Sequence, residues 1–370
     1  MVKTIPIRGQ DKSFGGDYTY IVAEIGKGFI QTKEDQKVST YLKNAIDLVD
    51  AAVDSGVDAV KFQTHVLEDE VLNIDFTSPH FKGSDRYSWV KRNEAATPIK
   101  EFWVPLVEHC KKKGITFFST PMSKKAAKKL EENFDVPFWK VGSGDVTDHV
   151  LLDYICGTGK PIIISTGMVG LSELDEVIKY IQEKGSPLVV LYCISEYPCP
   201  PEHFNLGTIR YLKEKYPDVI VGFSDHSVDS NDVDLAAVKL GARIIEKHLT
   251  FDRKLFGSDH KASVLPSEMK QLVEDIRARN YESIDTSPYY GNKERELAGS
   301  NNQFRPYFHK ALMAGADIKE GTKLTKDTIF AMRPMIHAGG LHASKLEDVL
   351  GKCVTKNVKK FDPITEDIIK

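Results

Sequence analysis

Eight short apolar runs, separated by stretches of helical periodicity, constrain the fold of this chain more than any other feature. Alternation of strand-like and helix-like segments is typical of a parallel sheet covered by helices. Eight such units predict a (β/α)8 TIM barrel. The runs occupy residues 20–26, 59–64, 115–121, 138–145, 161–167, 188–195, 219–226 and 243–250.

A doubly wound parallel sheet is the alternative architecture with the same alternation. Such a fold carries a glycine-rich phosphate-binding turn after its first strand. The turn at residues 26–29 reads Gly-Lys-Gly-Phe and does not match that motif. The sequence therefore favours the barrel.

The barrel is expected to fill residues 1–283, and a different organisation follows it. Residues 284–304 are polar and typical of a linker. Within residues 305–370, the segments 317–329 and 357–369 share one pattern of apolar, lysine and Thr-x-Asp-x-Ile positions. This repeat predicts a compact pseudo-symmetric module. A unit of this size is marginally stable alone, so we expect it to pack against another part of the molecule.

Charge and cysteine content exclude several classes of partner. With 50 basic and 53 acidic residues the net charge is −3, which gives no global field to attract nucleic acid or an anionic membrane. The N-terminus lacks the apolar core of a secretory signal, and no apolar run is long enough to span a bilayer, so we expect a soluble, cytoplasmic protein. The five cysteines are scattered and odd in number, which predicts reduced thiols.

Polar side chains stand where nearly every apolar run ends. In a TIM barrel the carboxyl ends of the strands surround the mouth in which the chemistry takes place. These positions are therefore the first candidates for a functional site. They are Glu24, Lys61, Gln63, Thr120, Lys140, Ser143, Asp145, Ser165, Tyr197, Ser224, His226 and His248.

Two of these ends, in neighbouring strands, present histidines. His226 and His248 each have acidic residues beside them, and together they could hold one metal ion with positions left open for substrate. Two imidazoles with oxygen donors suit Mn²⁺, Fe²⁺ or Zn²⁺ better than Ca²⁺. The alternative is that each histidine only caps a strand. If the pair binds metal, Asp225 is a candidate for orienting an imidazole.

Lysines at strand ends are confined within a barrel mouth. Lys61 and Lys140 follow apolar residues, and an ammonium group beside several hydroxyl donors is a common way to hold phosphate. The alternative is a Schiff-base aldolase, in which one desolvated lysine is the nucleophile. The hydroxyls expected beside the lysines are those of Thr120, Ser143, Ser165 and Ser224.

Three carboxylates complete the set of candidates. Glu24 could orient or deprotonate a water molecule, unless it is an exposed surface residue. Asp145 and Asp259 are acceptors suited to sugar hydroxyls, although Asp259 could equally be an ordinary residue of the turn that begins at Gly257.

The strand ends together resemble those of the sialic acid synthase family. The segments that carry the resemblance are AEIG (23–26), DAVKFQTH (58–65), FFSTP (117–121), KVGSGD (140–145), STGM (165–168), YCISEYP (192–198), GFSDH (222–226), IIEKHLTFDR (244–253) and GSDHKAS (257–263). The C-terminal segments ADIKEGTKLT (316–325) and FAMRP (330–334) are similar to the small β-rich antifreeze-like (SAF) domain that ends these enzymes. The resemblance covers nearly the whole chain in the right order.

This resemblance implies a transferase that forms a carbon–carbon bond between phosphoenolpyruvate and an N-acyl hexosamine, either N-acetylmannosamine or a modified analogue. Phosphate leaves by carbon–oxygen cleavage. A divalent metal, Mn²⁺ or Mg²⁺, is expected at the positions that match His226 and His248, where it polarises the sugar aldehyde.

The same resemblance assigns roles to the remaining candidates. The position of Glu24 handles water, and that of Arg333 contacts the acyl group of the sugar in the partner subunit of a domain-swapped homodimer. The positions that hold phosphoenolpyruvate match Lys61, Thr120, Lys140, Ser143, Ser165 and Ser224. Those that bind the sugar match Gln63, Asp145, Tyr197 and Asp259.

The chain departs from the family in two segments. Residues 26–35 lack the usual Asn-His-Asn-Gly, and residues 335–345 replace a glycine-rich turn and add two histidines. We expect both changes to lie near the acyl and distal groups of the sugar, which favours a modified hexosamine of the legionaminic or pseudaminic type over N-acetylmannosamine. One alternative is a related synthase acting on a phosphorylated sugar, which would need a second basic cluster. The other is a non-catalytic glycan-binding or ice-binding protein.

Overall fold

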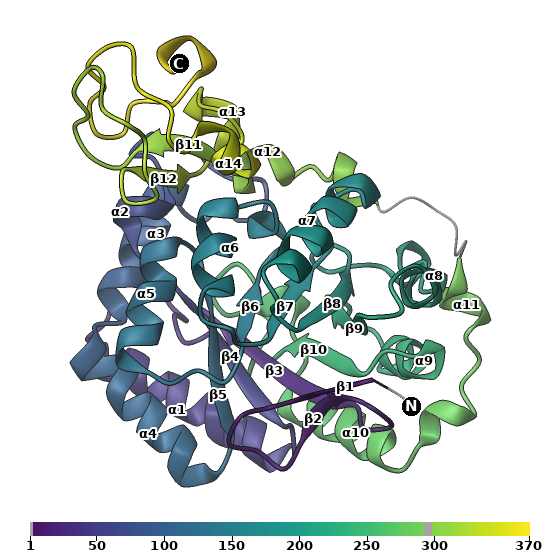
Figure 1. Cartoon of the computed structure of the whole chain (residues 1–370). Coiled ribbons are helices and arrows are strands. Elements are labelled where there is room, and N and C mark those ends of the chain that lie inside the picture. Colours follow the sequence, from purple (N-terminus) through teal and green to yellow (C-terminus); the bar gives the residue numbers. More distant parts are fainter. Residues whose placement is uncertain (1–2, 292–297) are drawn as a thin grey trace.

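A computed structural model describes residues 3–291 and 298–370, and eight parallel strands form its centre (Figure 1). The strands follow the order β5-β4-β3-β10-β9-β8-β7-β6, and the contact of β5 with β6 nearly closes the ring. Each expected apolar run contains one strand, so the TIM barrel is confirmed. The strands are β3 (Tyr20–Gly26), β4 (Ala59–Thr64), β5 (Thr116–Pro121), β6 (Trp139–Val141), β7 (Ile162–Ser165), β8 (Leu188–Cys193), β9 (Ile220–Asp225) and β10 (Ile244–His248).

Helices surround the barrel, and their apolar faces pack on its outer side. In α5 the buried Ala126, Ala127 and Leu130 share one face, and Ser123 caps the first turn by accepting a hydrogen bond from the backbone of Ala126. The helices are α1 (Val38–Asp54), α2 (Leu67–Glu70), α3 (Arg86–Ala96), α4 (Val104–Lys113), α5 (Lys124–Asn133), α6 (His149–Cys156), α7 (Leu171–Glu183), α8 (Gly207–Lys215), α9 (Asp232–Leu240), α10 (Pro266–Arg277), α11 (Ser287–Tyr290), α12 (Arg305–Phe308), α13 (Met335–Ala338) and α14 (Leu346–Val349).

Side chains along each barrel strand alternate between the interior and the helices. In β3, Tyr20 and Val22 belong to the interior core, whereas Ile21 and Ala23 pack with the helices. The alternation has a period of two, so Glu24 also faces inward at the carboxyl end. The strand geometry thus brings the polar strand ends together.

An N-terminal hairpin that the sequence did not reveal covers the opposite end of the barrel. It pairs β1 (Thr4–Pro6) with β2 (Ser13–Gly15). The ring of Phe14 lies 5.1 Å from that of Tyr20 and 4.9 Å from that of Phe138. Because these rings belong to the interior core, the hairpin seals the barrel far from the C-terminal module (Figure 1).

The C-terminal part is a small β-rich unit with its own core, as expected. It contains the antiparallel pair β11 (Ala311–Ala314) and β12 (Ile329–Met332). Ile318 and Val358, which are equivalent in the two repeats, exchange reciprocal backbone hydrogen bonds of 2.8 Å. Reciprocal bonding between equivalent residues places them at a local two-fold axis, which accounts for the sequence repeat.

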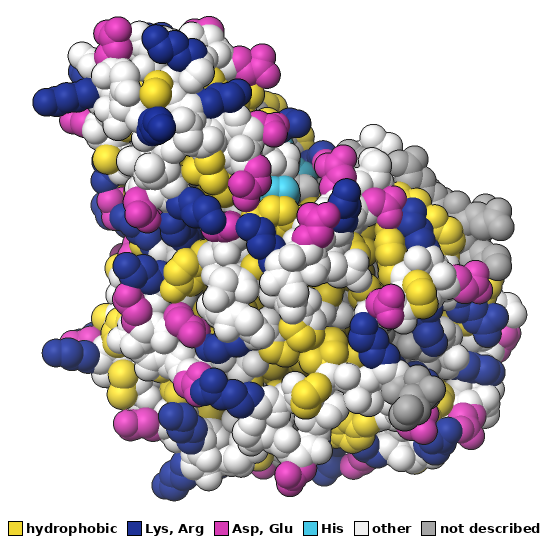
Figure 2. All heavy atoms as spheres, in the orientation of Figure 1, with side chains coloured by type: hydrophobic (Ala, Val, Ile, Leu, Met, Phe, Trp, Pro, Cys, Tyr) yellow, Lys and Arg dark blue, Asp and Glu magenta, His cyan; other side chains and the backbone are white. Residues whose placement is uncertain are grey.

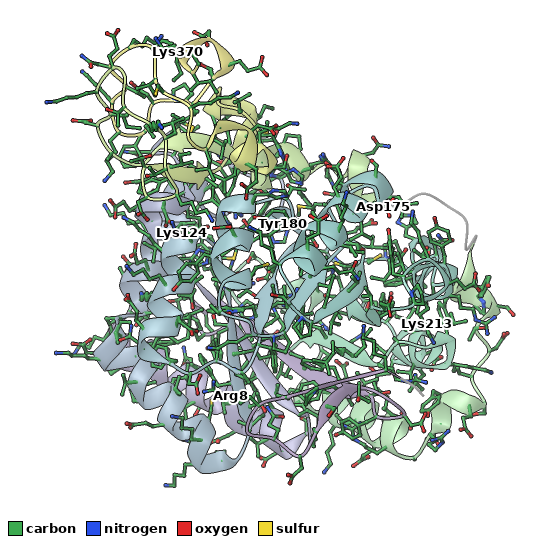
Figure 3. All side chains as sticks on the ribbon, viewed as in Figure 1. Arg8, Lys124, Asp175, Tyr180, Lys213 and Lys370 are labelled. Carbon is green, nitrogen blue, oxygen red and sulfur yellow. The ribbon has the colours of Figure 1, made fainter. Side chains whose placement is uncertain are left out.

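This module packs on the barrel of the same chain. The backbone amide of Arg333 donates to the carbonyl of Glu70 (2.9 Å). Lys310 Nζ contacts Asp148 Oδ2 (2.9 Å). The hydroxyl of Tyr180, a residue of α7 that Figure 3 labels, donates to Glu347 Oε1 of the module (3.4 Å). These contacts agree with the expectation that the module packs against another part of the molecule.

The expected domain limits stay a prediction, and residues 292–297 of the expected linker lie outside the described residues. Within the described ranges no helix combines the length and the apolar composition needed to cross a bilayer. On the face shown in Figure 2, basic and acidic side chains are interspersed rather than gathered by sign.

Gly222 in β9 occupies a position with no room for a side chain. A Cβ there would lie 2.5 Å from Leu191 Cδ2 and 2.7 Å from the carbonyl oxygen of Ile244. We expect Gly222→Ala to lower the free energy of unfolding by about 1–3 kcal/mol, because a backbone atom cannot move aside easily. Denaturant unfolding measures the change, with Gly142→Ala as the control because its nearest contact would be 3.9 Å. Equal stabilities of the two variants would contradict the packing argument.

Candidate active site

A cavity opens at the carboxyl ends of the barrel strands, beneath the C-terminal module. Every candidate residue lines it, so the structure brings the whole set together. The candidates are Glu24, Lys61, Gln63, Thr120, Lys140, Ser143, Asp145, Ser165, Tyr197, Ser224, His226, His248, Asp259 and Arg333.

Lys61 and Lys140 lie on one side of this cavity around a shared carboxylate. Lys140 Nζ donates to Ser165 Oγ (2.7 Å), and Lys61 Nζ donates to Thr120 Oγ1 (3.3 Å). Both ammonium nitrogens face Glu246 Oε1, at 3.6 Å for Lys61 and 3.8 Å for Lys140. The two lysines and their hydroxyls form a concentrated set of donors, which suits a phosphate or carboxylate.

Glu246 is a site residue to which the sequence reasoning gave no role. It accepts a hydrogen bond from Ser224 Oγ (3.2 Å) and is 6% exposed. The signal was present in the strand alternation, because Glu246 lies two residues before His248 and therefore faces the same way. Its negative charge lies close to both ammonium groups and opposes the effect of burial. With Glu24 it raises the pKa of Lys61 above the ordinary value, whereas burial still lowers the pKa of Lys140.

Glu24 is buried, so the alternative of an exposed surface carboxylate is wrong. Its Oε2 lies 2.7 Å from Lys61 Nζ, and its Oε1 accepts a hydrogen bond of 2.9 Å from Gln63 Nε2. Burial raises the pKa of Glu24 to about 7, with a further contribution from Glu246 and opposition from Lys61. A carboxyl group with this pKa can both take up and release a proton near neutrality.

His226 and His248 face each other across the cavity, with ring centres 5.5 Å apart. His226 Nδ1 donates to the carbonyl oxygen of Ile194 (2.7 Å), so its Nε2 carries the free lone pair. Burial lowers the pKa of each imidazole to about 4, and both are therefore neutral at physiological pH.

Neutral imidazole nitrogens, with the tautomer of His226 fixed by its hydrogen bond to Ile194, fit a divalent metal ion. Among the described residues no group of three or more His, Cys, Asp or Glu side chains is arranged to hold one. The protein would therefore supply two nitrogen ligands, and oxygen atoms of substrate or water would complete the coordination. This donor set suits a site that exchanges ligands rather than a closed structural site.

Asp225 does not orient the imidazole of His226, contrary to the hypothesis from the sequence. It forms an ion pair with Lys247 and accepts a hydrogen bond from Ser227 Oγ (2.7 Å). Lys247 also contacts Asp234 Oδ2 of α9 (2.7 Å). Strand alternation turns Asp225 toward the helices, where it belongs to a buried charged network, and the Ile194 carbonyl orients the imidazole instead.

The side of the cavity nearest the module carries the candidates for sugar binding. Arg333 forms an ion pair with Asp145, whose Oδ1 also lies 2.8 Å from Lys310 Nζ. Asp259 Oδ1 lies 3.2 Å from His80 Nε2, so this residue both begins a turn and lines the cavity. In the single chain Arg333 reaches its own barrel, and exchange of modules between subunits stays a prediction.

The two divergent segments differ in their position. Lys27 of the first segment lines the cavity, whereas no residue of 335–345 does so. His342 of the second segment instead contacts His309 (3.2 Å between Nε2 and Nδ1), where the module meets the barrel. The second departure therefore lies where the module docks on the barrel, and its expected position beside the sugar stays a prediction.

Several other residues of the cavity wall were not expected. Except for Cys193, which is the last residue of β8, they lie in loops, at the start of a helix or in the segment near the expected linker, so no strand-end pattern marks them. They are Lys27, His80, Arg86, Cys193, Phe304 and Phe308.

Comparisons with known proteins agree with this geometry. The sequence model of the NeuB family matches residues 48–286, and that of the SAF domain matches residues 309–370. The N,N'-diacetyllegionaminic acid synthase of Campylobacter jejuni is 32% identical over 88% of this chain and 95% of that protein. The human N-acetylneuraminate-9-phosphate synthase is 29% identical over 96% of this chain and 94% of its own length. The crystal structure of the spore coat polysaccharide biosynthesis protein SpsE of Bacillus subtilis gives a TM-score of 0.80 at 28% identity and covers 100% of this chain and 99% of that one.

Proposed function

Because the chain belongs to the NeuB family, we propose that it is a nonulosonic acid synthase that condenses phosphoenolpyruvate with an N-acyl hexosamine. The observation that carries this proposal is the meeting of two lysines, two histidines and a buried carboxyl in one cavity. Fold alone would not support it, since barrels of this kind host many chemistries.

Phosphoenolpyruvate is an anion with a phosphate and a carboxylate at its two ends. Lys61 and Lys140 provide the positive charge for it, and the hydroxyls beside them provide directed donors. Glu246 lies between the two ammonium groups and limits their movement. The raised pKa of Lys61 keeps that lysine protonated and argues against it as a Schiff-base nucleophile. Burial lowers the pKa of Lys140, so the Schiff-base alternative would have to use Lys140, whose Nζ donates to Ser165 Oγ. The hydroxyls are those of Thr120, Ser143, Ser165 and Ser224.

The open-chain sugar binds on the side of the cavity nearest the module, where Asp145, Asp259, Gln63 and Tyr197 accept or donate hydrogen bonds to its hydroxyls and Arg333 donates to its acyl carbonyl. Carbon 3 of phosphoenolpyruvate attacks the aldehyde carbon, and the aldehyde oxygen takes a proton. A divalent ion, Mn²⁺ or Mg²⁺, bound through His226 and His248 would polarise that oxygen.

Attack by carbon 3 leaves a cationic centre at carbon 2, to which water adds. Glu24 takes the proton of that water, a role that its pKa of about 7 suits. The carbon–oxygen bond to the phosphate then breaks, phosphate leaves with the bridging oxygen, and a 2-keto acid with a newly formed carbon–carbon bond remains. The module over the cavity limits the access of other water molecules.

The proposal is tested by incubating the protein and divalent metal with phosphoenolpyruvate and a panel of hexosamines while inorganic phosphate is measured. We expect phosphate release that requires both the metal and an N-acyl hexosamine. A glycan-binding protein would release none. We also expect this protein to be soluble and cytoplasmic. The proposal includes a domain-swapped homodimer, and analytical ultracentrifugation tests whether the protein is a dimer.

Arg333 is expected to act mainly in sugar binding. Arg333→Ala should raise the KM for the sugar about 10- to 100-fold with a smaller change in kcat, because it removes a charged donor to the acyl carbonyl. Asp145 keeps its contact with Lys310 in this variant, which limits structural damage. Steady-state kinetics at saturating phosphoenolpyruvate measures the change, and the exposed Arg279→Ala is the control. A fall in kcat with an unchanged sugar KM would contradict this role.

A further inference from the structure

Lys27 follows β3 and reaches the cavity without a charged partner. Gly26 turns the chain with a φ of +54°, and the Lys27 that follows is only 7% exposed and lines the cavity. Within the described ranges, no ion pair or side-chain hydrogen bond engages its ammonium nitrogen. An ammonium group that is buried without a partner is costly, and natural proteins keep such groups mostly where they act.

The surroundings of Lys27 do not neutralise its charge. Burial lowers the pKa of Lys27 to about 8, although Asp259 acts in the opposite direction. Asp259 is engaged with His80 at 3.2 Å. Burial therefore destabilises the charged form of Lys27 more than the nearby carboxylates stabilise it. A bound anion would offset this difference.

Arg86, at the start of α3, adds a second cation to this part of the cavity wall. Its Nη2 lies 3.4 Å from Glu70 Oε1, and its Nε is buried with no hydrogen-bond partner among the described residues. Glu70 does not belong to Arg86 alone, because its other oxygen contacts His65 Nδ1 at 2.7 Å. Arg86 therefore has a donor to spare for a ligand.

These cations form a group apart from the lysines that bind phosphoenolpyruvate in the proposed reaction. Lys61 and Lys140 share Glu246 and Lys61 also contacts Glu24. Asp259 and Glu70 act on both Lys27 and Arg86, Arg86 also acts on Lys27, and Glu24 is the weakest of the carboxylates that act on Lys27. A second basic cluster is what a synthase for an anionic sugar requires.

Resting on the function proposed above, the structure assigns Lys27 and Arg86 to a subsite for a negatively charged substituent on the hexosamine, a carboxylate or a phosphate ester. Both side chains line the same cavity as the residues proposed to hold the sugar, and Arg86 Nε is buried without a hydrogen-bond partner. A neutral hexosamine would leave Lys27 without an ion pair and Arg86 Nε without an acceptor. The charged substituent therefore serves as the specificity group of the substrate.

A competing explanation is that Lys27 only positions Asp259 for a sugar hydroxyl. The two explanations differ in what Lys27→Met does. Loss of an anion subsite would lower kcat/KM for charged sugars selectively, whereas loss of the positioning of Asp259 would lower kcat/KM for all sugars alike. Kinetics with a matched set of sugars separates them.

The experiment compares N-acetylmannosamine, its 6-phosphate and its 6-carboxylate (the uronic acid) as substrates, with phosphate release from phosphoenolpyruvate as the readout after correction for any sugar phosphatase activity. We expect the wild type to use at least one charged sugar with a kcat/KM about tenfold or more above that of the neutral sugar. Lys27→Met should lower this value about 10- to 100-fold for the charged sugar, and far less for the neutral one. The preferred charged sugar identifies the anion as phosphate or carboxylate.

Lys33→Met is the matched control, because Lys33 lies in the same segment and is exposed. We expect it to leave the ratio of charged to neutral sugar unchanged. A wild type that prefers the neutral sugar, or a Lys27→Met variant that loses equally on all sugars, would overturn the subsite. Thermal unfolding of both variants identifies any loss caused by misfolding, in which case Lys27→Gln replaces Lys27→Met.

Failure of the proposed function gives a different result. If no sugar supports phosphate release, calorimetric binding of the two charged sugars to the wild type and to Lys27→Met still decides the subsite. Weaker binding by Lys27→Met supports it, and equal binding or no binding to the wild type overturns it.

Discussion

Replacement of His226 by alanine is expected to lower kcat for phosphate release about a thousandfold. The expectation rests on the polarisation of the sugar aldehyde by a divalent ion, a contribution of several kcal/mol to transition-state stabilisation. His226→Ala removes one of two nitrogen ligands and leaves His248 alone. The same loss is expected for His248→Ala, because either substitution leaves a single imidazole of the pair for the ion.

The histidine variants need a readout apart from activity. Mn²⁺ titration followed by electron paramagnetic resonance measures the dissociation constant of the ion directly, and we expect it to rise at least about tenfold in each variant. His203→Ala is the control, since His203 is exposed and its side chain pairs with Glu196 outside the cavity. Unchanged Mn²⁺ binding together with full activity would show that the two histidines are strand caps, the alternative that the sequence left open.

Replacement of Glu24 by glutamine is expected to lower kcat by about 10²- to 10⁴-fold, the range that general acid–base catalysis contributes. Glutamine keeps the size of the side chain but cannot take a proton from water. Lys61 retains Glu246 as a counter-charge, so the KM for phosphoenolpyruvate should change much less than kcat. Steady-state kinetics in both substrates separates the two effects.

Glu24→Asp is the informative companion, because it keeps the carboxyl group and shortens its reach. We expect it to recover part of the activity that Glu24→Gln loses. A Glu24→Gln variant with kcat within a few-fold of the wild type would remove Glu24 from the reaction. A rise in the KM for phosphoenolpyruvate as the main effect would make it a binding residue that acts through Lys61.

The barrel and most of its mouth could be predicted because strands impose a strict local rule. Each strand alternates its side chains, and the polar ends of parallel strands meet at one edge, so residues such as Lys140 and Ser165 are neighbours by topology. Their role depends on chemistry that is visible in the residue types. The same rule places Glu246 in the mouth of the barrel, because a spacing of two residues from His248 makes both side chains face the same way.

Other parts of the site depend on tertiary packing that leaves no local pattern. Lys27 lies in a turn, and Arg86 begins a helix whose position is set by contacts with distant segments. The N-terminal hairpin has strands of three residues, too short for a periodic signal, and is held by the insertion of Phe14 into the barrel. Asp225 is the opposite case. It is a polar residue at a strand end, but its side chain faces the helices and forms an ion pair with Lys247.

The most direct test of the proposed reaction is the fate of an isotopic label in phosphoenolpyruvate. The substrate carries ¹⁸O at the oxygen that bridges carbon 2 and phosphorus, and the products are analysed by mass spectrometry after reaction with an N-acyl hexosamine and metal. Carbon–oxygen cleavage predicts that the released phosphate contains the label and that the keto oxygen of the sugar acid comes from water. Label retained in the sugar acid, with unlabelled phosphate, would contradict the proposed chemistry.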